Sequence, residues 1–450
     1  MSDGPAYGFY GDDFTGATDT LAHLARAGLR TMLFFQPPTD AQLDAAGPLD
    51  AIGVASAARA MAPPAMKPAL MRAGARFAEL GVRILHYKVC STFDSSPALG
   101  SIGAAVSTLR GFFPNPLVPV IGGQPGLQRY CAFGNLFAAG SSTGGGEAPP
   151  VLRIDRHPTM SRHPATPMLE ADLRLHLQDQ GLPGMGLIDW RHYTSTSGRL
   201  DAQVNGHIES ACPAVLFDVL DDAHLAPIGR LLAERSAGVP LLAVGPSSVA
   251  QAWTMATRSA DSSVPIASPA AALQVQRSSG PVFVFAGSLS PTTSRQIDAA
   301  HSYSRVEIDP AQVDAGSLDR YLDDIVTLLR SGKNVLTFTS RAFDQTSNRR
   351  DDTTRACAAL VRRVVMSMTL RRICIAGGDT SSFAVQALGG WGLSYIGAIA
   401  EGVAMCRLHA DAEELDGIEI ALKGGQMGGI DFFERLLDES ARRTTDKPNL

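Results

Sequence analysis

Residues 7–27, YGFYGDDFTGATDTLAHLARA, decide the fold class because they join a strand pattern to a helix pattern through a polar turn. Tyr7–Tyr10 is a short run of mostly large apolar residues, which favours a buried strand. Thr18–Ala27 carries its apolar residues at helical spacing. A strand that runs directly into a helix is the unit from which parallel sheets flanked by helices are built.

The same alternation continues along the chain and predicts an α/β protein of two domains, each a mainly parallel sheet flanked by helices. The further strands are predicted at Thr31–Phe35, Ala51–Ala55, Arg83–Lys88, Leu117–Ile121, Gly186–Trp190, Ala214–Val219, Pro240–Val244, Pro281–Ala286, Val306–Ile308, Asn334–Thr339, Arg372–Ala376 and Ile418–Leu422. The further helices are predicted at Pro68–Leu80, Met168–Gln178, Ala223–Ser236 and Phe383–Leu388.

The segment Ala256–Gly280 interrupts this alternation, since it is rich in Ser, Ala and Pro and has no clear period. Such a composition is typical of a connection between domains. We therefore predict an N-terminal domain over residues 1–255, a linker over 256–280 and a C-terminal domain over 281–450.

Composition and charge exclude several classes of protein. Hydrophobic residues make up 45% of the 450-residue chain, which is enough for a folded core. The net charge of −5 lacks the basic excess of a nucleic-acid-binding protein. The sequence shows neither a signal peptide nor an apolar stretch long enough to cross a membrane, which predicts a cytoplasmic protein. The six cysteines have no metal-binding spacing, so we expect free and mostly buried thiols.

Two adjacent acids, Asp12 and Asp13, follow the first predicted strand. Ligands of open parallel sheets bind at the carboxyl ends of the strands, so these side chains are candidates for holding substrate hydroxyls, a metal or a proton. The alternative is that Asp12, Asp13 or Thr15 only caps the helix that follows. A cap needs one acid, and the presence of two, with Asp19 behind them, favours a functional role.

A second polar turn, Tyr87–Ser96, combines Lys88 with an acid and several hydroxyls, among them those of Ser91 and Thr92. A cation beside hydroxyl groups suits a small polyhydroxylated anion. The alternative is a Ser/Thr-rich turn from which Lys88 reaches solvent.

A third segment, residues 153–168, places Arg162 and other cationic side chains among prolines. Cations held in a rigid loop suit the recognition of a carboxylate or a phosphate. Taken alone, however, this segment is better explained as a solvated loop. Its histidines lack the spacing of a metal site, so no protein metal ligands are predicted.

Glycine-rich turns follow three predicted strands of the second half. Glycines let backbone N–H groups approach an anion, and the start of a helix adds favourable partial charge. One such turn could be a tight strand-to-helix connection, but three in one domain favour a phosphate-rich ligand such as a nucleotide. The candidate nucleotide-binding residues in these turns are Ser288, Ser290, Gly377, Gly378, Asp379, Thr380, Lys423, Gly424 and Gly425.

Taken together, these segments resemble the four-carbon acid sugar kinase family over nearly the whole chain. One departure is that residues 123–126, GQPG, stand where the family often has an Arg-Thr pair, with Arg129 further on, and this bears on the particular substrate. The resemblance rests on GDDFTGATD at residues 11–19, KVCSTFDSS at 88–96, GSIG at 100–103, HPATPM at 163–168, GSLSPTT at 287–293, AGGDTS at 376–381 and LKGGQMGG at 422–429.

The resemblance implies a kinase that uses ATP to phosphorylate a four-carbon sugar acid, such as threonate, erythronate or 3-oxo-tetronate, at its terminal hydroxyl. It also implies that the C-terminal domain binds ATP and the N-terminal domain binds the acid. The residues that would face the acid are Asp12, Asp13, Lys88, Ser91, Thr92 and Arg162.

Phosphoryl transfer relies mainly on positioning and charge stabilisation. Asp13 is the first candidate for the base that accepts the proton of the attacking hydroxyl, and Asp12 is the alternative. Mg²⁺ is expected to bridge the ATP phosphates, and the two domains are expected to close over the reactants. The alternative function is a sensor that binds a sugar acid without transferring phosphate, and whether the chain forms a homo-oligomer stays open.

Overall fold

The structure is a computed structural model that describes residues 4–140, 149–163, 165–193, 197–260, 275–287, 290–309, 315–340 and 350–437. It divides into two compact units, Met1–Ser268 and Pro269–Leu450. Each unit contains a mainly parallel sheet flanked by helices, which confirms the predicted fold class. Much of the predicted linker, residues 261–274, lies outside the described residues.

The strands of the first unit's large sheet are β1 (Tyr7–Gly11), β2 (Thr31–Phe34), β3 (Ala51–Ala55), β4 (Ile84–Lys88), β5 (Pro119–Ile121), β9 (Gly186–Ile188), β10 (Val215–Phe217) and β11 (Leu241–Gly245). Their order is β2-β3-β1-β4-β11-β5-β10-β9, and neighbouring strands are parallel. Gly11 pairs with Ala55 and Lys88, and Lys88 pairs with Gly245. The carboxyl ends of the central strands therefore meet at one edge, where the polar turns lie.

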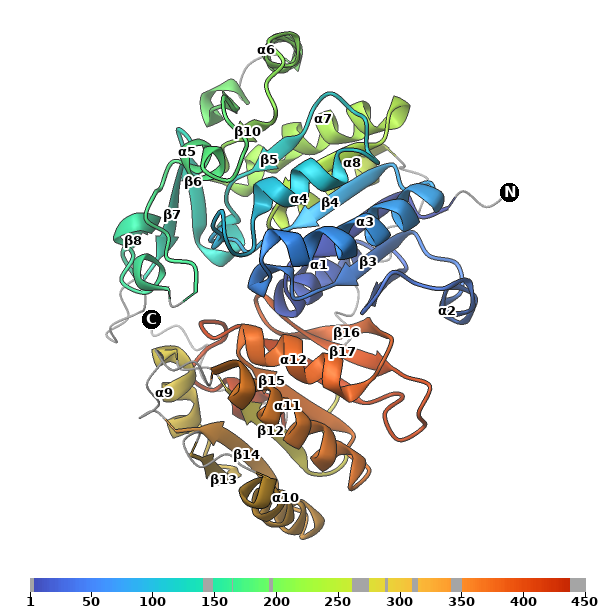
Figure 1. Ribbon diagram of the computed structural model, residues 1–450, viewed down its shortest axis with the longest axis vertical. Helices are drawn as coiled ribbons and strands as arrows, with labels where there is room; N and C mark the ends of the chain where they lie inside the picture. The colour runs from blue at the N-terminus through green and yellow to red at the C-terminus, as the bar shows by residue number, and fades with distance from the viewer. Residues whose placement is uncertain are drawn as a thin grey trace, which may run out of the picture. The chain divides into compact units, whose positions relative to one another are not determined.

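Helices cover both faces of this sheet, which is why its strands are almost continuously apolar. Helix α3 packs against α4, and α7 packs against α8, which also contacts α1 (Figure 1). Helix α1 begins at Phe14, before the predicted Thr18, because the Asp13 side chain caps its start by accepting a hydrogen bond from the Gly16 N–H. The helices of this unit are α1 (Phe14–Arg26), α2 (Asp40–Ala46), α3 (Pro63–Glu79), α4 (Ile102–Leu109), α5 (Leu173–Gln178), α6 (Ser197–Glu209), α7 (Leu225–Gly238) and α8 (Ser248–Ala260).

A small antiparallel sheet in the first unit was not among the predicted strands. It consists of β6 (Arg129–Ala132), β7 (Asn135–Ala139) and β8 (Val151–Arg153). These strands are short and only partly buried, so their sequences lack the apolar runs that identify the strands of the large sheet. The helix predicted from Met168 is also shorter than expected, because Asp172 caps α5 and starts it at Leu173.

The second unit has the strand order β13-β14-β12-β15-β18-β17-β16. It is parallel from β13 to β18, and β16 and β17 form an antiparallel hairpin on its edge. Ala286, Ala376 and Lys423 lie in register at the ends of three adjacent strands. The strands are β12 (Val282–Ala286), β13 (Tyr303–Ile308), β14 (Asn334–Thr339), β15 (Arg372–Ala376), β16 (Gly392–Ala400), β17 (Val403–His409) and β18 (Glu419–Lys423).

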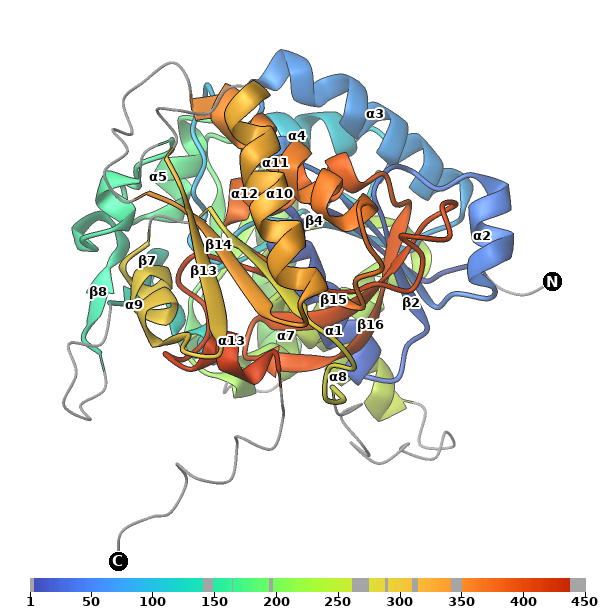
Figure 2. The same cartoon turned by 90° about the horizontal axis from the view of Figure 1, so that it is seen from below.

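The helices of the second unit pack in two groups. Helix α11 contacts both α10 and α12, and this group lies over β13, β14 and β15 (Figure 2), while α13 contacts α9. The hairpin of β16 and β17 was not predicted, and the small and partly buried residues of β16 give only a weak strand pattern. The helices are α9 (Pro291–Ala299), α10 (Ala315–Arg330), α11 (Arg350–Met366), α12 (Gly378–Leu388) and α13 (Phe432–Arg435).

Two further sequence predictions concern cysteines and membranes. All six cysteines are free, and four of them are buried, which confirms that expectation. Over the described residues, no helix is both long and apolar enough to cross a membrane.

Candidate active site

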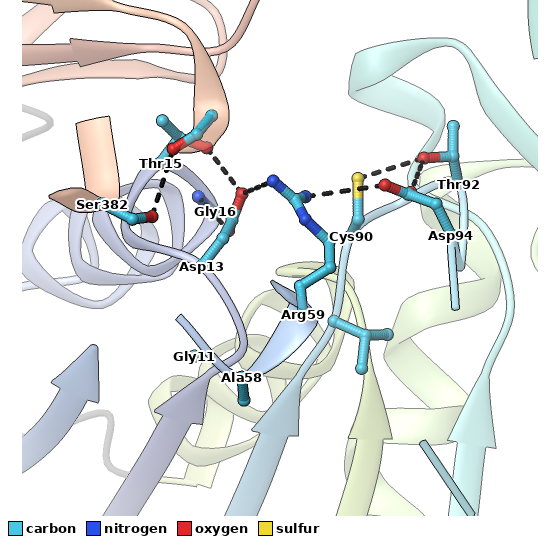
Figure 3. A network of polar contacts seen from close by, with 12 residues as sticks. Gly11, Asp13, Thr15, Gly16, Ala58, Arg59, Cys90, Thr92, Asp94 and Ser382 are labelled. Carbon is cyan, nitrogen blue, oxygen red and sulfur yellow. Dashed lines mark hydrogen bonds and ion pairs between the residues drawn. The ribbon is translucent and has the colours of Figure 1, made fainter. Parts of the chain in front are cut away.

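Asp13 is held in place from several sides at the end of β1. Its Oδ1 accepts a hydrogen bond from the Gly16 N–H at 2.8 Å, so Asp13 does cap α1. Its Oδ2 accepts a hydrogen bond from the Thr15 hydroxyl at 2.8 Å and forms an ion pair with Arg59 Nη2 at 2.9 Å (Figure 3). Burial alone would raise the pKa of Asp13, but Arg59, Lys88 and the two hydrogen bonds outweigh it and lower the pKa below its ordinary value.

Asp12 stands beside Asp13 but in a different electrostatic state. The side chain is 4% exposed, and its Oδ1 has no hydrogen-bond partner among the described residues. Burial and the neighbouring Asp13 carboxylate raise the pKa of Asp12 to about 7, against the opposing influence of Arg59 and Lys88. Two adjacent carboxyl groups thus differ in proton affinity, as an acid-base site requires.

Lys88 ends β4 and is 3% exposed, so it does not reach solvent. Its Nζ donates a hydrogen bond to the Val89 carbonyl oxygen at 2.8 Å. The absence of a side chain at Gly16 makes room for it, because a Cβ there would overlap both Nζ and the Asp13 Oδ1. A buried cation therefore lies beside the two acids.

The turn after β4 continues this polar cluster. Arg59 Nη1 lies 3.7 Å from Asp94 Oδ2, so Arg59 links Asp94 to Asp13. Asp94 accepts a hydrogen bond from the Thr92 hydroxyl, which also lies 3.0 Å from the Cys90 Sγ (Figure 3). Burial would raise the pKa of Asp94, but Arg59, His163 and Thr92 bring it down to about 2. Two predicted residues of this turn, Ser91 and Thr92, are buried.

The cationic loops differ in their relation to this cluster. His163 acts on the pKa of Asp94, so the third predicted segment does approach the β4 turn. Arg162 is exposed. Arg129 lies at the start of β6, where burial lowers its pKa and the neighbouring Cys90 and Asp94 oppose this effect. Its Nε is buried and has no partner within the described part of the chain.

The three glycine-rich turns of the second unit also come together. The Gly287 N–H donates to the Ala376 carbonyl at 2.9 Å, and the Gly377 N–H donates to the Lys423 carbonyl at 2.8 Å. Gly287 also lies against the Thr380 side chain, where a Cβ would overlap the hydroxyl. Gly377 has a φ of 130°, a conformation that favours glycine, and Gly378 begins α12 directly after it.

Helix α9 and the turn after β18 are joined by side chains. Ser290 caps α9 by accepting a hydrogen bond from the Thr293 N–H at 3.1 Å, and its hydroxyl also donates to the Gly425 carbonyl. Lys423 is fully buried, with its Nζ 3.1 Å from the Thr293 Oγ1 and 3.0 Å from the Gly424 carbonyl. Burial lowers the pKa of Lys423 to about 8. Lys423 therefore lies beneath the glycine-rich turn.

Two predicted site residues are not fully described by the structure, and several residues of the observed clusters were not predicted from the sequence. Ser288 lies outside the described residues, and only the backbone of Asp379 is described. Arg59 was not predicted, because it sits in a short helical turn after β3 without any motif around it. Asp94 was inside a quoted motif, but its pairing with Arg59 depends on the fold. Thr293 was the last residue of a quoted motif but was not named as a site residue, and Gln296 lay outside every quoted motif; both bind the turn after β18.

Two family models match the chain, one in each unit. A model described as a sugar-binding N-terminal domain matches residues 7–253, and one described as a nucleotide-binding C-terminal domain matches residues 283–433. A 3-oxo-isoapionate kinase from Paraburkholderia graminis is 36% identical, with 94% of this chain and 92% of the relative covered. A 3-oxo-tetronate kinase from Methylobacterium radiotolerans is 30% identical, with 97% and 99% covered.

A crystal structure from Salmonella typhimurium LT2, provisionally described as a tRNA synthase, has a TM-score of 0.75 at 22% identity. It covers 96% of this chain and 99% of its own, and this likeness concerns the fold alone. The fold is thus that of a two-domain α/β protein whose first unit matches a sugar-binding domain model and whose second unit matches a nucleotide-binding domain model. The chain belongs to the four-carbon acid sugar kinase family, and it is a sugar-acid kinase.

Proposed function

We propose that this kinase transfers the terminal phosphate of ATP to the terminal hydroxyl of a small sugar acid held at the carboxyl edge of the first unit's sheet. The observation that carries the proposal is one buried cluster in which Asp12 has an unpartnered oxygen and Lys88 supplies a cation beside it. A buried polar atom without a partner calls for an explanation, and a bound hydroxyl group provides one.

The contacts suggest distinct roles for the residues of this cluster. Lys88 would attract the carboxylate of the sugar acid, since its cation is buried and bonded to one carbonyl oxygen in the described structure. Asp12 would accept the proton of the attacking hydroxyl, because a base works best with a pKa near the working pH. Asp13 is less suited to that role, because Arg59, Thr15 and Gly16 occupy its oxygens. Asp13 would instead fix the start of α1 and the position of Arg59.

The converging turns of the second unit are the proposed site for the ATP phosphates. Among the described residues, no group of three or more His, Cys, Asp or Glu side chains is arranged to hold a metal ion. Mg²⁺ often keeps few protein ligands and binds largely through substrate phosphates. A site with few protein ligands therefore fits Mg²⁺ that arrives bound to ATP. When bound, the ion would offset the charge on the phosphate oxygens.

The substrate is proposed to be a 3-oxo sugar acid, because the names of both relatives above specify such a substrate. A coupled ATP-consumption assay over 3-oxo-isoapionate, 3-oxo-tetronates, threonate and erythronate tests this. We expect consumption that depends on the acid and is fastest with a 3-oxo form. Binding of an acid without any ATP consumption would instead support the sugar-acid sensor.

Gly378→Val tests the proposed nucleotide site. Gly378 is the first residue of α12 and has no left-handed backbone, so a side chain there causes no backbone strain, but it would obstruct a phosphate at the helix start. Loss of one or two charge-assisted hydrogen bonds predicts an ATP KM raised by roughly 10- to 100-fold, with little change in Tm. An unchanged ATP KM in the folded variant would remove this turn from the nucleotide site.

A further inference from the structure

One face of α9 holds the turn after β18 by its carbonyl groups. Gln296 is 1% exposed, and its Nε2 lies 3.0, 3.0 and 2.8 Å from the carbonyl oxygens of Met427, Gly428 and Gly429. One turn earlier on α9, the Thr293 hydroxyl donates to the Gly425 carbonyl at 2.8 Å. These contacts, with those of Ser290 and Lys423, are called the α9 clamp here.

The clamp determines which side of the turn faces outward. Its donors engage the carbonyl oxygens of Gly424, Gly425, Met427, Gly428 and Gly429. In a trans peptide the C=O and the following N–H point in opposite directions. The N–H groups that follow the carbonyls bound by α9 are therefore turned away from α9, on a turn that is partly buried up to Gly428 and exposed at Gly429. Several N–H groups on one side of a glycine-rich turn form a concave site for anions.

Only the nitrogen of the Gln296 side-chain amide, and not its oxygen, has hydrogen-bond partners among the described residues. Its Oε1 is buried and has no partner in the part of the chain that the structure describes. A buried amide oxygen without a partner is costly, and the two N–H groups of Nε2, which three carbonyl oxygens share, are what offsets this cost. Lys423 is fully buried among carbonyl oxygens, so it contributes charge to the turn from beneath.

We propose that Gln296 is a positioning residue of the nucleotide site, which holds the turn at residues 424–429 so that its N–H groups face the ATP phosphates. The inference rests on the proposed function, in which these turns bind ATP. Gln296 itself touches no substrate in this scheme. Its effect passes through the backbone of the turn, and it should therefore change nucleotide binding more than it changes turnover.

Gln296→Met is the direct test, because methionine has a similar length and no donor. We expect the ATP KM to rise at least roughly tenfold, while kcat and the KM for the sugar acid change little. The gain in Tm on adding ATP should shrink in parallel. A lower Tm with an unchanged ATP KM would mean that Gln296 is merely structural and would overturn the proposal.

Asn334→Leu is the matched control. Asn334 is also an amide that binds backbone groups of the second unit, accepting from the Val282 N–H at 2.9 Å and donating to the Ser302 carbonyl at 3.3 Å. It lies at the opposite ends of the strands, so its loss should lower Tm without raising the ATP KM. If Gln296→Met does not fold, Thr293→Val removes one clamp donor at little change in shape, and a several-fold rise in ATP KM is expected.

Comparison with Gly378→Val distinguishes a wrong role for Gln296 from a wrong nucleotide site. If Gly378→Val raises the ATP KM and the clamp variants do not, the nucleotide site stands and the role of Gln296 is wrong. If none of these variants changes the ATP KM, the nucleotide does not bind at these turns, and the proposed function fails together with the clamp.

Discussion

Asp12→Asn is expected to lower kcat by at least roughly a hundredfold, because a base at the attacking hydroxyl contributes typically 10²–10⁴ to the rate. Asparagine has nearly the same size and cannot accept the proton. ATP and sugar-acid binding should persist, so the loss should appear in kcat. Steady-state kinetics with both substrates measures this directly.

The pH dependence of the wild-type enzyme should also reflect the role of Asp12 as the base. Asp12 must be ionised to act as a base, and its pKa is raised to about 7. We therefore expect kcat/KM for the sugar acid to rise with pH through a midpoint near 7 and to level off above it. The Asp12→Asn variant should lose this rise in its residual activity.

Asp12→Asn should also stabilise the fold at high pH. Because the folded pKa of Asp12 lies above its unfolded value of 3.8, the ionised carboxylate destabilises the folded state. Stability is thus lost as the pH rises between about 4 and about 7, and the variant removes that loss. Its Tm should exceed that of the wild type at pH 8 and match it at pH 4. A residue with a purely structural role would not combine a lower kcat with a higher Tm.

Asp13→Asn and Asp221→Asn are the matched controls. Asp13→Asn keeps the cap on α1 but loses the ion pair with Arg59, so it should lower Tm near neutral pH with a smaller loss of kcat. Asp221 caps a short helical turn on the surface, and Asp221→Asn should change neither Tm nor kcat. A large loss of kcat in Asp13→Asn, together with near-normal turnover in Asp12→Asn, would make Asp13 the base.

Lys88→Met is expected to raise the KM for the sugar acid by roughly 10- to 100-fold, since hydrogen bonds to charged groups contribute about 1.5–3 kcal/mol. Methionine fills a similar volume, so the fold should persist. The ATP KM should stay near its wild-type value, because Lys88 lies in the first unit's cluster. Kinetics with each substrate varied in turn separates the two constants.

The same variant should shift the pH profile. Lys88 lowers the pKa of Asp12, so its removal leaves that pKa higher. The rise of kcat/KM should accordingly move to higher pH in Lys88→Met. Lys67→Met, on the exposed face of α3, removes a surface cation and should change neither the KM for the acid nor the pH profile. An unchanged KM for the acid in Lys88→Met would exclude Lys88 from the substrate site.

Local sequence patterns are sufficient for the fold class and for the location of the polar turns. The strand from Tyr7, the Asp12–Asp13 turn and the capped start of α1 follow from apolar runs and capping chemistry within one short stretch. Because parallel strands end at one edge, the strand pattern alone predicts that turns following different strands lie near each other. The hairpin of β16 and β17 and the small sheet that carries Arg129 were not predicted, since strands such as β6 and β16 are short or only partly buried and lack a clear period.

The sequence by itself determined which chemical groups this protein places at its strand ends, because those groups lie next to the patterns that form the strands. Only the tertiary structure decided how the groups differ. Asp12 and Asp13 are neighbours of the same type, yet Arg59 forms an ion pair with Asp13, while Asp12 keeps an unpartnered oxygen. Gln296 likewise reaches carbonyl groups far along the chain. Burial and electrostatic pairing depend on residues distant in sequence, so no local pattern can encode them.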